Sequence, residues 1–331
     1  MKTPHNFAIA ESTFLITGGT GSFGKTMTEY LLNCGAGLVR VLSRDESKQF
    51  ALRNKFENPR LELLLGDVRE INTIEYGLRD IDYVFHAAAL KHVPASEDNP
   101  IEYVKTNVYG SHLLLSALRN SNVKSAVFLS TDKAVYPVNA MGMSKALMEK
   151  LVRSNTYNGP VRSCITRYGN VIGSRGSVIP YFIEQIKTEK PIKVTDWSMT
   201  RFVMSLEESV ALVLQALSSG SQGDLFVRKA PSASLDKILT AVEILLGKKA
   251  KSVIVAGVRP GEKIHETLLN SEEKTYAVEE SDYYKVPSVA IGSTANKARL
   301  LDEFRSDNSN QLSIDDLTKI LLSNPEIQSL I

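Results

Sequence analysis

Short apolar runs alternate with longer stretches of helical periodicity as far as Tyr168. The apolar runs favour buried strands and span Thr13–Thr17, Leu38–Ser43, Leu61–Leu65, Tyr83–Ala88, Ala126–Ser130 and Cys164–Tyr168. Between them, apolar residues recur at helical spacing over Phe23–Asn33, Glu46–Phe56, Ile101–Asn120 and Met141–Tyr157. Because parallel strands need such helical crossovers, the alternation predicts an α/β fold with a doubly wound, Rossmann-like parallel sheet.

Glycine and proline interrupt this alternation after Tyr168. We therefore predict two domains, residues 1–172 and residues 173–331, the second being a smaller α/β domain that ends in a C-terminal arm. A later apolar run, Asp224–Arg228, is expected to return to the first sheet, and a helix is expected near Ser313–Leu322. Ligands of such sheets bind at the carboxyl ends of the strands, so candidate chemistry is sought there.

Charge and composition exclude several classes of protein. The 331 residues carry 39 Lys and Arg against 37 Asp and Glu. A net charge of +2 is too small to favour nucleic acid as a partner. No apolar run approaches the ~20 residues that span a membrane, and the N-terminus lacks a signal-peptide pattern, so we expect a soluble, cytoplasmic protein. The two cysteines lack zinc spacing, and His86 and His92 are interpreted as structural, so no metal is expected.

A glycine-rich turn follows the first predicted strand and opens the first predicted helix. Gly18, Gly21 and Gly24 occupy a G-x-x-G-x-x-G pattern, and Thr20, Ser22 and Phe23 lie between them. Glycines allow a tight turn and let backbone N–H groups approach a pyrophosphate at the positive end of a helix. In this strand-turn-helix context the pattern predicts dinucleotide binding by the first domain.

The end of the second predicted strand indicates which dinucleotide binds. Ser43, Arg44 and Lys48 stand where many NAD enzymes place a carboxylate near the ribose 2′-hydroxyl. The guanidinium of Arg44 can pair with a 2′-phosphate, and Lys48 adds a second cation, which favours NADP. Asp45 keeps NAD open as the alternative. Further along the chain, position places Asp67 and Val68 near the adenine and Ala87 and Ala88 where the cofactor crosses the sheet.

The most informative segment follows the fifth predicted strand. It reads Ser130-Thr131-Asp132-Lys133-Ala134-Val135-Tyr136-Pro137, and Met141-Gly142-Met143-Ser144-Lys145 opens the next helix. Together with GGTGSFG, HAAALKHVPASEDNP and RPGEKIHE, it resembles the inverting UDP-N-acetylglucosamine 4,6-dehydratases of the extended short-chain dehydrogenase/reductases. The resemblance runs from about residue 12 to residue 290. The T-D-K triplet is its most discriminating part, since retaining dehydratases carry T-D-E and simple 4-epimerases lack both the acid and the base.

The resemblance implies an NADP-dependent 4,6-dehydration of UDP-N-acetylglucosamine with inversion at C5, in the biosynthesis of bacterial capsule or surface polysaccharide. It also implies a homo-oligomer, in particular a hexamer. Asp132 would be the acid that releases the C6 hydroxyl, if burial raises its pKa. Lys133 would be the base at C5, if Lys145 and the oxidised nicotinamide lower its pKa. Thr131 would bind the C4 oxygen, and Lys145 would also hold the nicotinamide ribose.

Met141 departs from the pattern of the superfamily, which places a tyrosine four residues before the lysine. A thioether cannot accept the proton of the C4 hydroxyl. Capsule-type members of the dehydratase family resemble this chain in having methionine there. The group that accepts this proton therefore stays open.

The remaining expected contacts are assigned by position and by the family resemblance. Asn107, Tyr168, Asn170 and Val171 are assigned to the cofactor, and Lys91 is expected to face the cofactor or the sugar. Arg175, Ser177 and Val178 precede a predicted helix, whose N-terminus suits phosphate. Thr195, Arg201 and Arg259 are expected to close over the pyrophosphate, Glu262 to accept from the ribose, and Asn170 to touch the sugar as well.

Two rival interpretations remain open at this stage. The first is another sugar-nucleotide enzyme, either a 4-epimerase or a retaining dehydratase. The second is a cofactor-binding sensor that has lost the catalytic tyrosine. Lys133 argues against a retaining dehydratase, and the presence of Asp132, Lys133 and the arginines argues against a sensor.

Overall fold

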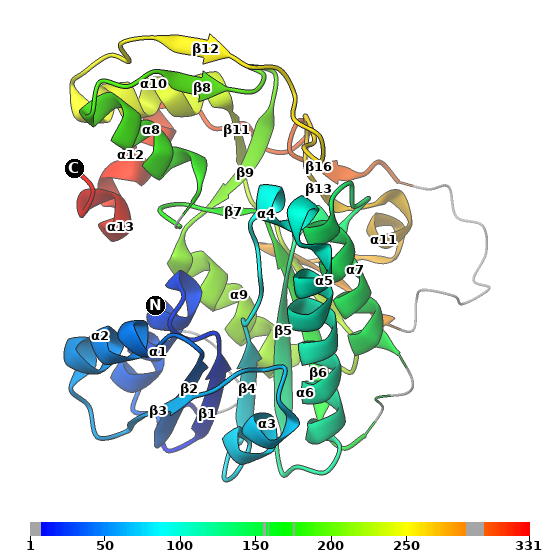
Figure 1. Cartoon of the computed structure of the whole chain (residues 1–331). Coiled ribbons are helices and arrows are strands. Elements are labelled where there is room, and N and C mark those ends of the chain that lie inside the picture. Colours follow the sequence, from blue (N-terminus) through cyan, green and yellow to red (C-terminus); the bar gives the residue numbers. More distant parts are fainter. Residues whose placement is uncertain (1–7, 155–156, 158, 175, 289–300) are drawn as a thin grey trace.

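The computed structural model describes residues 8–154, 157, 159–174, 176–288 and 301–331 (Figure 1). Its main sheet has the strand order β14-β15-β10-β6-β5-β4-β1-β2-β3. Seven strands are parallel: β1 (Thr13–Thr17), β2 (Leu38–Ser43), β3 (Leu61–Leu65), β4 (Tyr83–His86), β5 (Ser125–Thr131), β6 (Arg162–Tyr168) and β10 (Leu225–Arg228). β15 (Tyr283–Val286) and β14 (Val278–Glu279) extend the sheet in the antiparallel direction. The predicted doubly wound sheet is confirmed, and the run at Asp224–Arg228 does return to it as β10.

Helices cover both faces of this sheet because alternate side chains of each strand point to opposite sides. In β1, Phe14 and Ile16 enter the apolar core shared with α1 (Ser22–Asn33), α2 (Glu46–Phe56) and α9 (Leu206–Ser219). Leu15 enters the other core, shared with α3 (Ile71–Gly77), α6 (Gly110–Leu118) and α7 (Ala140–Arg153). This arrangement leaves the carboxyl edge of the parallel strands free for a site.

The sequence prediction was wrong in local detail at three elements. The expected helix Ile101–Asn120 is divided into α5 (Pro100–Tyr103), a π-helical segment Val104–Tyr109 and α6. The expected strand Tyr83–Ala88 ends at His86, because the next two residues turn against the glycine loop. The expected helix Met141–Tyr157 ends at Arg153.

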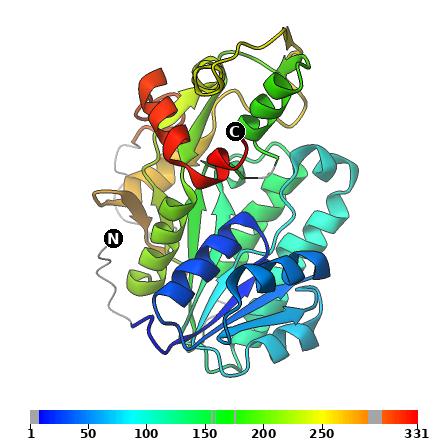
Figure 2. The ribbon, with the colours of Figure 1, turned by 90° about the vertical axis from the view of Figure 1, so that its left-hand side faces the viewer.

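A second group of elements lies beyond the carboxyl edge of the main sheet (Figures 1 and 2). It contains α4 (Val93–Asp98), α8 (Val178–Lys187), α10 (Leu235–Leu246), α12 (Ile314–Ser323) and α13 (Pro325–Gln328). The short helix α11 (Ser271–Tyr276) lies beside α7 instead, and its Glu273 pairs with Arg167 of β6 at 2.7 Å (Figure 1). Three small sheets join β7 (Asn170–Val171), β9 (Thr200–Met204) and β11 (Ser232–Ser234), β8 (Ile192–Val194) with β12 (Val253–Val255), and β13 (Thr267–Leu269) with β16 (Phe304–Arg305). A third apolar core unites α8, α10 and α12. A domain boundary at residue 172 stays a prediction, and α12 accounts for the helix expected near Ser313–Leu322.

No helix among the described residues is long and apolar enough to cross a membrane.

Candidate active site

The glycine turn lies where the strand order reverses, since β1 pairs with β2 on one side and β4 on the other. Gly18 has a φ of +67°, and a Cβ there would stand 2.7 Å from backbone atoms of Ala88. A Cβ on Gly24 would stand 2.3 Å from Cα of Gly19, so α1 packs directly on the turn. Side chains at these two positions would therefore collide with backbone atoms, so this close packing requires glycine. The result is a backbone-lined cradle in front of the N-terminus of α1.

Polar side chains gather beside this cradle at the ends of β2 and β3. The hydroxyl oxygens of Thr20 and Ser43 lie 2.7 Å apart. Arg44 forms an ion pair of 3.4 Å with Asp67. Burial opposes ionisation of Asp67, but hydrogen bonds from Arg69 outweigh it and lower the pKa of that carboxyl. The structure therefore brings three residues assigned to the adenosine end, Ser43, Arg44 and Asp67, together with Thr20 of the glycine turn.

Lys48 is placed differently from the expectation of a cation offered to a phosphate. Its ammonium pairs with the carboxylate of Asp45, whose side chain also caps the N-terminus of α2 by accepting from the backbone N–H of Lys48 at 2.9 Å. Both side chains are about half exposed, 47% for Arg44 and 42% for Lys48. The contact of Arg44 with Asp67 is long, at 3.4 Å, so Arg44 is the better placed of the two cations for an anionic ligand.

The T-D-K triplet forms the end of β5 and a 3₁₀ turn, Asp132–Ala134. Asp132 is fully buried, and its Oδ1 accepts from the hydroxyl of Thr131 at 2.8 Å and from Nζ of Lys133 at 3.0 Å. Its Oδ2 is also buried and has no hydrogen-bond partner among the residues that the structure describes. A buried carboxylate oxygen without a partner is costly, and here it faces Gly169 at the end of β6. This geometry suits a group that exchanges a proton with a ligand.

The pKa shift of Asp132 has the direction expected from the sequence, whereas the pKa shift of Lys133 has the opposite direction. Burial raises the pKa of Asp132, as its proposed acid role requires. Burial alone would lower the pKa of Lys133, but the carboxylates of Asp132 and Glu266 outweigh burial and raise it. The expectation that nearby cations lower this pKa was therefore wrong for the protein without ligands. Arg201 is a cation that acts in the expected direction, and Lys145 donates elsewhere.

Glu266 and Lys263 are members of this site that the sequence reasoning missed. Glu266 is 3% exposed, and its Oε1 lies 3.2 Å from Nζ of Lys133. Lys263 donates to the carbonyl oxygen of Val135, directly after the 3₁₀ turn, and burial lowers its pKa. Both residues lie in the segment RPGEKIHE, whose resemblance to the family was the available signal. Periodicity could not show that this loop returns to β5.

The first turn of α7 is packed directly on the triplet. The Asn139 side chain caps α7 by accepting from the Gly142 N–H at 2.8 Å. Met141 is buried, with 3% of its surface exposed. Lys145 donates to the carbonyl oxygen of Leu129 in β5 at 2.8 Å, and burial lowers its pKa to about 8. The structure therefore places Met141 and Lys145 on the helix that packs against the triplet.

Asn107 lies in the π-helical segment and is fully buried. Its amide accepts from the backbone N–H of Leu90 at 2.8 Å and donates to that residue's carbonyl oxygen and to the hydroxyl of Ser144, both at 2.9 Å. Its side chain therefore joins the loop after β4 to α7. Val68 is buried against Gly110 at the start of α6.

The residues assigned to the sugar nucleotide lie mostly in the second group of elements, and the charge of Arg201 acts on Lys133. Within the described part of the chain, buried oxygens of Asn170, Ser177 and Glu262 have no hydrogen-bond partner. Arg201 donates to the carbonyl oxygens of Thr200 and Ile264, at 2.8 and 3.0 Å. The unpartnered oxygens and the arginine mark a polar surface that a ligand can complete.

The other assigned residues take varied positions. Arg259 is half exposed and lies 3.8 Å from Glu262, whereas Thr195 is buried after β8. Val178 opens α8, Tyr168 ends β6, Val171 lies in β7 and Lys91 is exposed after β4. Arg175 lies outside the described residues. His86 is buried between the hydroxyls of Thr17 and Ser111, as a structural histidine would be.

Comparison with known proteins places this site in a family. The polysaccharide biosynthesis protein family matches residues 14–288. A relative from Rickettsia akari (strain Hartford), named UDP-glucose 4-epimerase, is 44% identical over 333 residues, covering 96% of this chain and 97% of the relative. Pen from Bacillus thuringiensis has a TM-score of 0.89 at 34% identity, covering 98% of this chain and 100% of Pen. DesIV, a dTDP-glucose 4,6-dehydratase from Streptomyces venezuelae solved with NAD, has a TM-score of 0.69 at 23% identity, covering 76% and 86%.

Fold and comparisons together define a nucleotide-sugar-modifying enzyme of the extended short-chain dehydrogenase/reductase class. Within that class, the chain belongs to the polysaccharide biosynthesis protein family.

Proposed function

We propose that this enzyme is an NADP-dependent UDP-N-acetylglucosamine 4,6-dehydratase that also inverts C5, acting in the synthesis of capsule or another surface polysaccharide. The observation that carries the proposal is the pair formed by the buried Asp132 and the partly buried Lys133, joined by a hydrogen bond of 3.0 Å at the carboxyl end of β5. Dehydration needs an acid for the departing hydroxyl and a base for the C5 proton, and this pair provides one of each. The unpartnered Oδ2 of Asp132 supplies a free position for the hydroxyl.

The protonation states needed for the reaction are reached within the pair. When a proton moves from Nζ of Lys133 to Oδ1 of Asp132, an N–H bond breaks, an O–H bond forms and the net charge is unchanged. The products are a neutral amine and a carboxylic acid, which are the forms that a base and an acid require. Burial raises the pKa of Asp132 and so helps it to hold the proton, whereas the carboxylates of Asp132 and Glu266 favour the charged form of Lys133. The reaction is proposed to use the fraction of the pair in which Asp132 carries the proton and Lys133 is neutral.

The residues of the glycine turn fit a dinucleotide. Gly18 approaches the backbone of Ala88 so closely that a Cβ would collide with it, and backbone N–H groups at the start of α1 suit a pyrophosphate. A bound nicotinamide supplies a hydride acceptor for C4 and a donor for C6. Arg44 supports the choice of NADP because its guanidinium is exposed beside the adenosine cluster. DesIV was solved with NAD, which keeps NAD as the alternative.

With C4 in the ketone form, the C5 proton is acidic, and the neutral amine of Lys133 takes it. The electron pair forms the C5–C6 double bond, the C6–O bond breaks, and the proton from Asp132 leaves with the hydroxyl as water. Hydride returned to C6 and a proton taken from water at C5, on the face opposite Lys133, would then saturate the double bond and invert C5. Thr131, whose hydroxyl lies 2.8 Å from Asp132, is proposed to bind the C4 oxygen in exchange for that contact.

The sugar nucleotide is proposed to lie between the triplet and the second group of elements. Its pyrophosphate would meet Ser177 at the N-terminus of α8, together with Thr195, Arg201 and Arg259. The unpartnered buried oxygens of Asn170 and Glu262 support contacts to hydroxyl groups of the sugar and the ribose. Exposed apolar side chains on neighbouring elements, Ile101, Val104, Met143 and Leu147, support a homo-oligomer. We place the protein in the cytoplasm.

The name of the Rickettsia relative favours a second candidate function, 4-epimerisation of a UDP-hexose. A simple epimerase needs no acid for a C6 hydroxyl, so the buried acid of the triplet favours dehydration. The two candidates are separated by incubating the purified protein with UDP-N-acetylglucosamine or UDP-glucose in deuterated buffer. Loss of one water and incorporation of deuterium at C5, followed by mass spectrometry and proton NMR, support the dehydratase. Isomerisation at unchanged mass overturns it.

A further inference from the structure

Glu266 brings a second carboxylate to the catalytic pair from a distant part of the sequence. Its Oε1 lies 3.2 Å from Nζ of Lys133, while Oδ1 of Asp132 lies 3.0 Å from the same nitrogen. The Lys133 ammonium is thus held between two carboxylates that are 0% and 3% exposed. A lysine side chain has four rotatable bonds, so two contacts restrict its ammonium far more than one contact.

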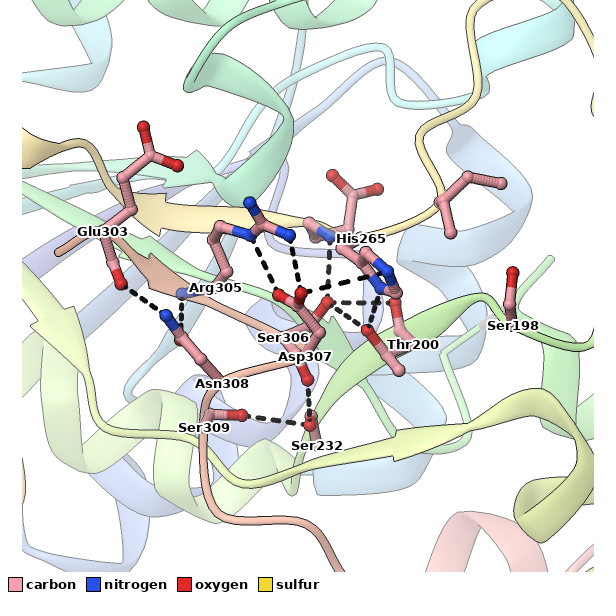
Figure 3. Close-up of polar contacts among 12 residues, drawn as sticks. Ser198, Thr200, Ser232, His265, Glu303, Arg305, Ser306, Asp307, Asn308 and Ser309 are labelled. Carbon is pink, nitrogen blue, oxygen red and sulfur yellow. Dashed lines mark hydrogen bonds and ion pairs between the residues drawn. The ribbon is translucent and has the colours of Figure 1, made fainter.

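The backbone of Glu266 is itself fixed by the C-terminal segment. Its N–H donates to the hydroxyl of Ser306 at 2.9 Å, and Ser306 is fully buried. The same hydroxyl lies 2.6 Å from that of Thr200 in β9, which in turn is 2.9 Å from Nδ1 of His265 (Figure 3). Pairing of β13 with β16 continues this attachment on the other side of Glu266. The backbone that carries the Glu266 carboxylate is therefore held in place by these hydrogen bonds.

The charges around Glu266 keep it ionised. Burial would raise its pKa, but Lys133, Arg201 and Lys263 outweigh burial and lower it. Its Oε2 lies 3.9 Å from Nζ of Lys263 and has no hydrogen-bond partner among the described residues. The charged groups facing the pair are therefore the two carboxylates, the ammonium groups of Lys133 and Lys263, and the guanidinium of Arg201.

We propose that Glu266 is a positioning residue, whose carboxylate holds Nζ of Lys133 in hydrogen-bond contact with Asp132 so that the pair can exchange a proton. This inference rests on the function proposed above. Glu266 keeps its own charge throughout, since the proton leaves Lys133 and binds Asp132. Its anion also acts on both partners: it stabilises the charged form of Lys133 and disfavours the charged form of Asp132.

The test compares wild type with Glu266→Gln, which keeps the size of the side chain but removes its charge, and with Glu266→Asp. Glu62→Gln is the matched control, because Glu62 pairs with the buried Arg40 at 2.9 Å on a distant strand. For Glu266→Gln we expect kcat for dehydration to fall at least about tenfold with KM nearly unchanged, and partial activity in Glu266→Asp. Both limbs of its pH profile should move about one unit toward acid, because an anion next to both groups is lost. Wild-type kcat and an unshifted profile in Glu266→Gln overturn the proposal.

A measurement without substrate separates this inference from the proposed function. The rate at which an amine-acylating reagent modifies Lys133, followed by peptide mass spectrometry against pH, reports the pKa of Lys133 in each variant. Glu266→Gln should become reactive at lower pH than wild type, whereas Glu62→Gln should not. An unchanged pH dependence overturns the role of Glu266. Absence of dehydration in wild type, with the shift in reactivity present, overturns only the proposed reaction.

Discussion

Gly142 in the first turn of α7 packs against the carbonyl oxygen of Lys133. A Cβ at position 142 would stand 2.3 Å from that oxygen, a distance that no side chain can occupy. The contact joins the helix that carries Met141 and Lys145 to the turn that carries the proposed acid and base. Because glycine has no side chain, α7 and the 3₁₀ turn approach each other more closely here than any other residue would allow.

Gly142→Ala should therefore displace the triplet from α7. The neighbour is backbone, which cannot rotate away as a flexible side chain would, so we expect turnover to fall by about tenfold or more. Gly77→Ala is the control, because a Cβ there, also in a helix, would make an ordinary contact of 3.4 Å. Steady-state kinetics and thermal unfolding of both variants check the prediction. Full activity in Gly142→Ala would show that the turn adapts.

The local features of the candidate site could be predicted from the sequence, whereas its long-range contacts could not. The strands, the glycine turn and the T-D-K triplet are local patterns, and all the expected strands of the first half are present, because period and turn chemistry act over a few residues. Glu266 contacts Lys133 across 133 positions of sequence. Ser306, which lies 40 positions after Glu266, binds the backbone N–H of Glu266. Such pairings depend on tertiary packing, which no local pattern encodes. The part of the raised pKa of Lys133 that comes from Glu266 could not be foreseen for the same reason.

Arg44 should determine the preference for NADP over NAD. A guanidinium that pairs with a 2′-phosphate contributes about 1.5–3 kcal/mol, so Arg44→Ala should lose most of the preference. Lys48→Ala should lose less, because the Lys48 ammonium is in close contact with Asp45, whereas Arg44 has only the long contact of 3.4 Å with Asp67. Calorimetric titration of each protein with NADP and NAD measures the ratio. Equal affinity of the wild type for both cofactors would refute the prediction.

Lys133→Met should abolish exchange of the C5 proton with deuterated solvent. Methionine has a similar length but no amine to accept the proton. Cofactor binding should remain, since the contacts of the glycine turn lie at the ends of β1 and β4. Proton NMR of the sugar after incubation reports the exchange, and calorimetry reports cofactor binding. Normal exchange in this variant would assign the base role to another residue.

His86 should make the folded protein sensitive to acid. Burial, together with the charge of Lys145, lowers the pKa of His86 to about 3 from 6.5. Between these two values the unfolded chain binds the proton more readily than the folded chain, so the free energy of unfolding decreases as the pH falls below 6.5. At about pH 5 this single group should cost about 2 kcal/mol. Urea unfolding of wild type and His86→Asn at about pH 7 and about pH 5 tests this, and an equal loss in both proteins would contradict it.

Met141 is where the pattern of the superfamily and the chemistry of the residue disagree. Its side chain is 3% exposed, and its carbonyl oxygen accepts from the hydroxyl of Ser144 at 2.7 Å. The side chain of Met141 is therefore buried in the first turn of α7. If the C4 hydroxyl gives its proton to Asp132, Lys133 or an ordered water, the thioether has only a packing role in the reaction.

On this account Met141→Ala should lower stability by about 2–5 kcal/mol, as truncation of a buried methionine does, while turnover of the folded enzyme stays within about tenfold. Met141→Tyr should bring no large gain, because the pocket is organised around another acceptor. The rival account holds that the methionine marks a crippled enzyme or a sensor. It expects a nearly inactive wild type and a rescue by Met141→Tyr of several orders of magnitude. Turnover of the three proteins, measured together with their folded fractions, separates the two accounts, and a large rescue by tyrosine would decide for the rival.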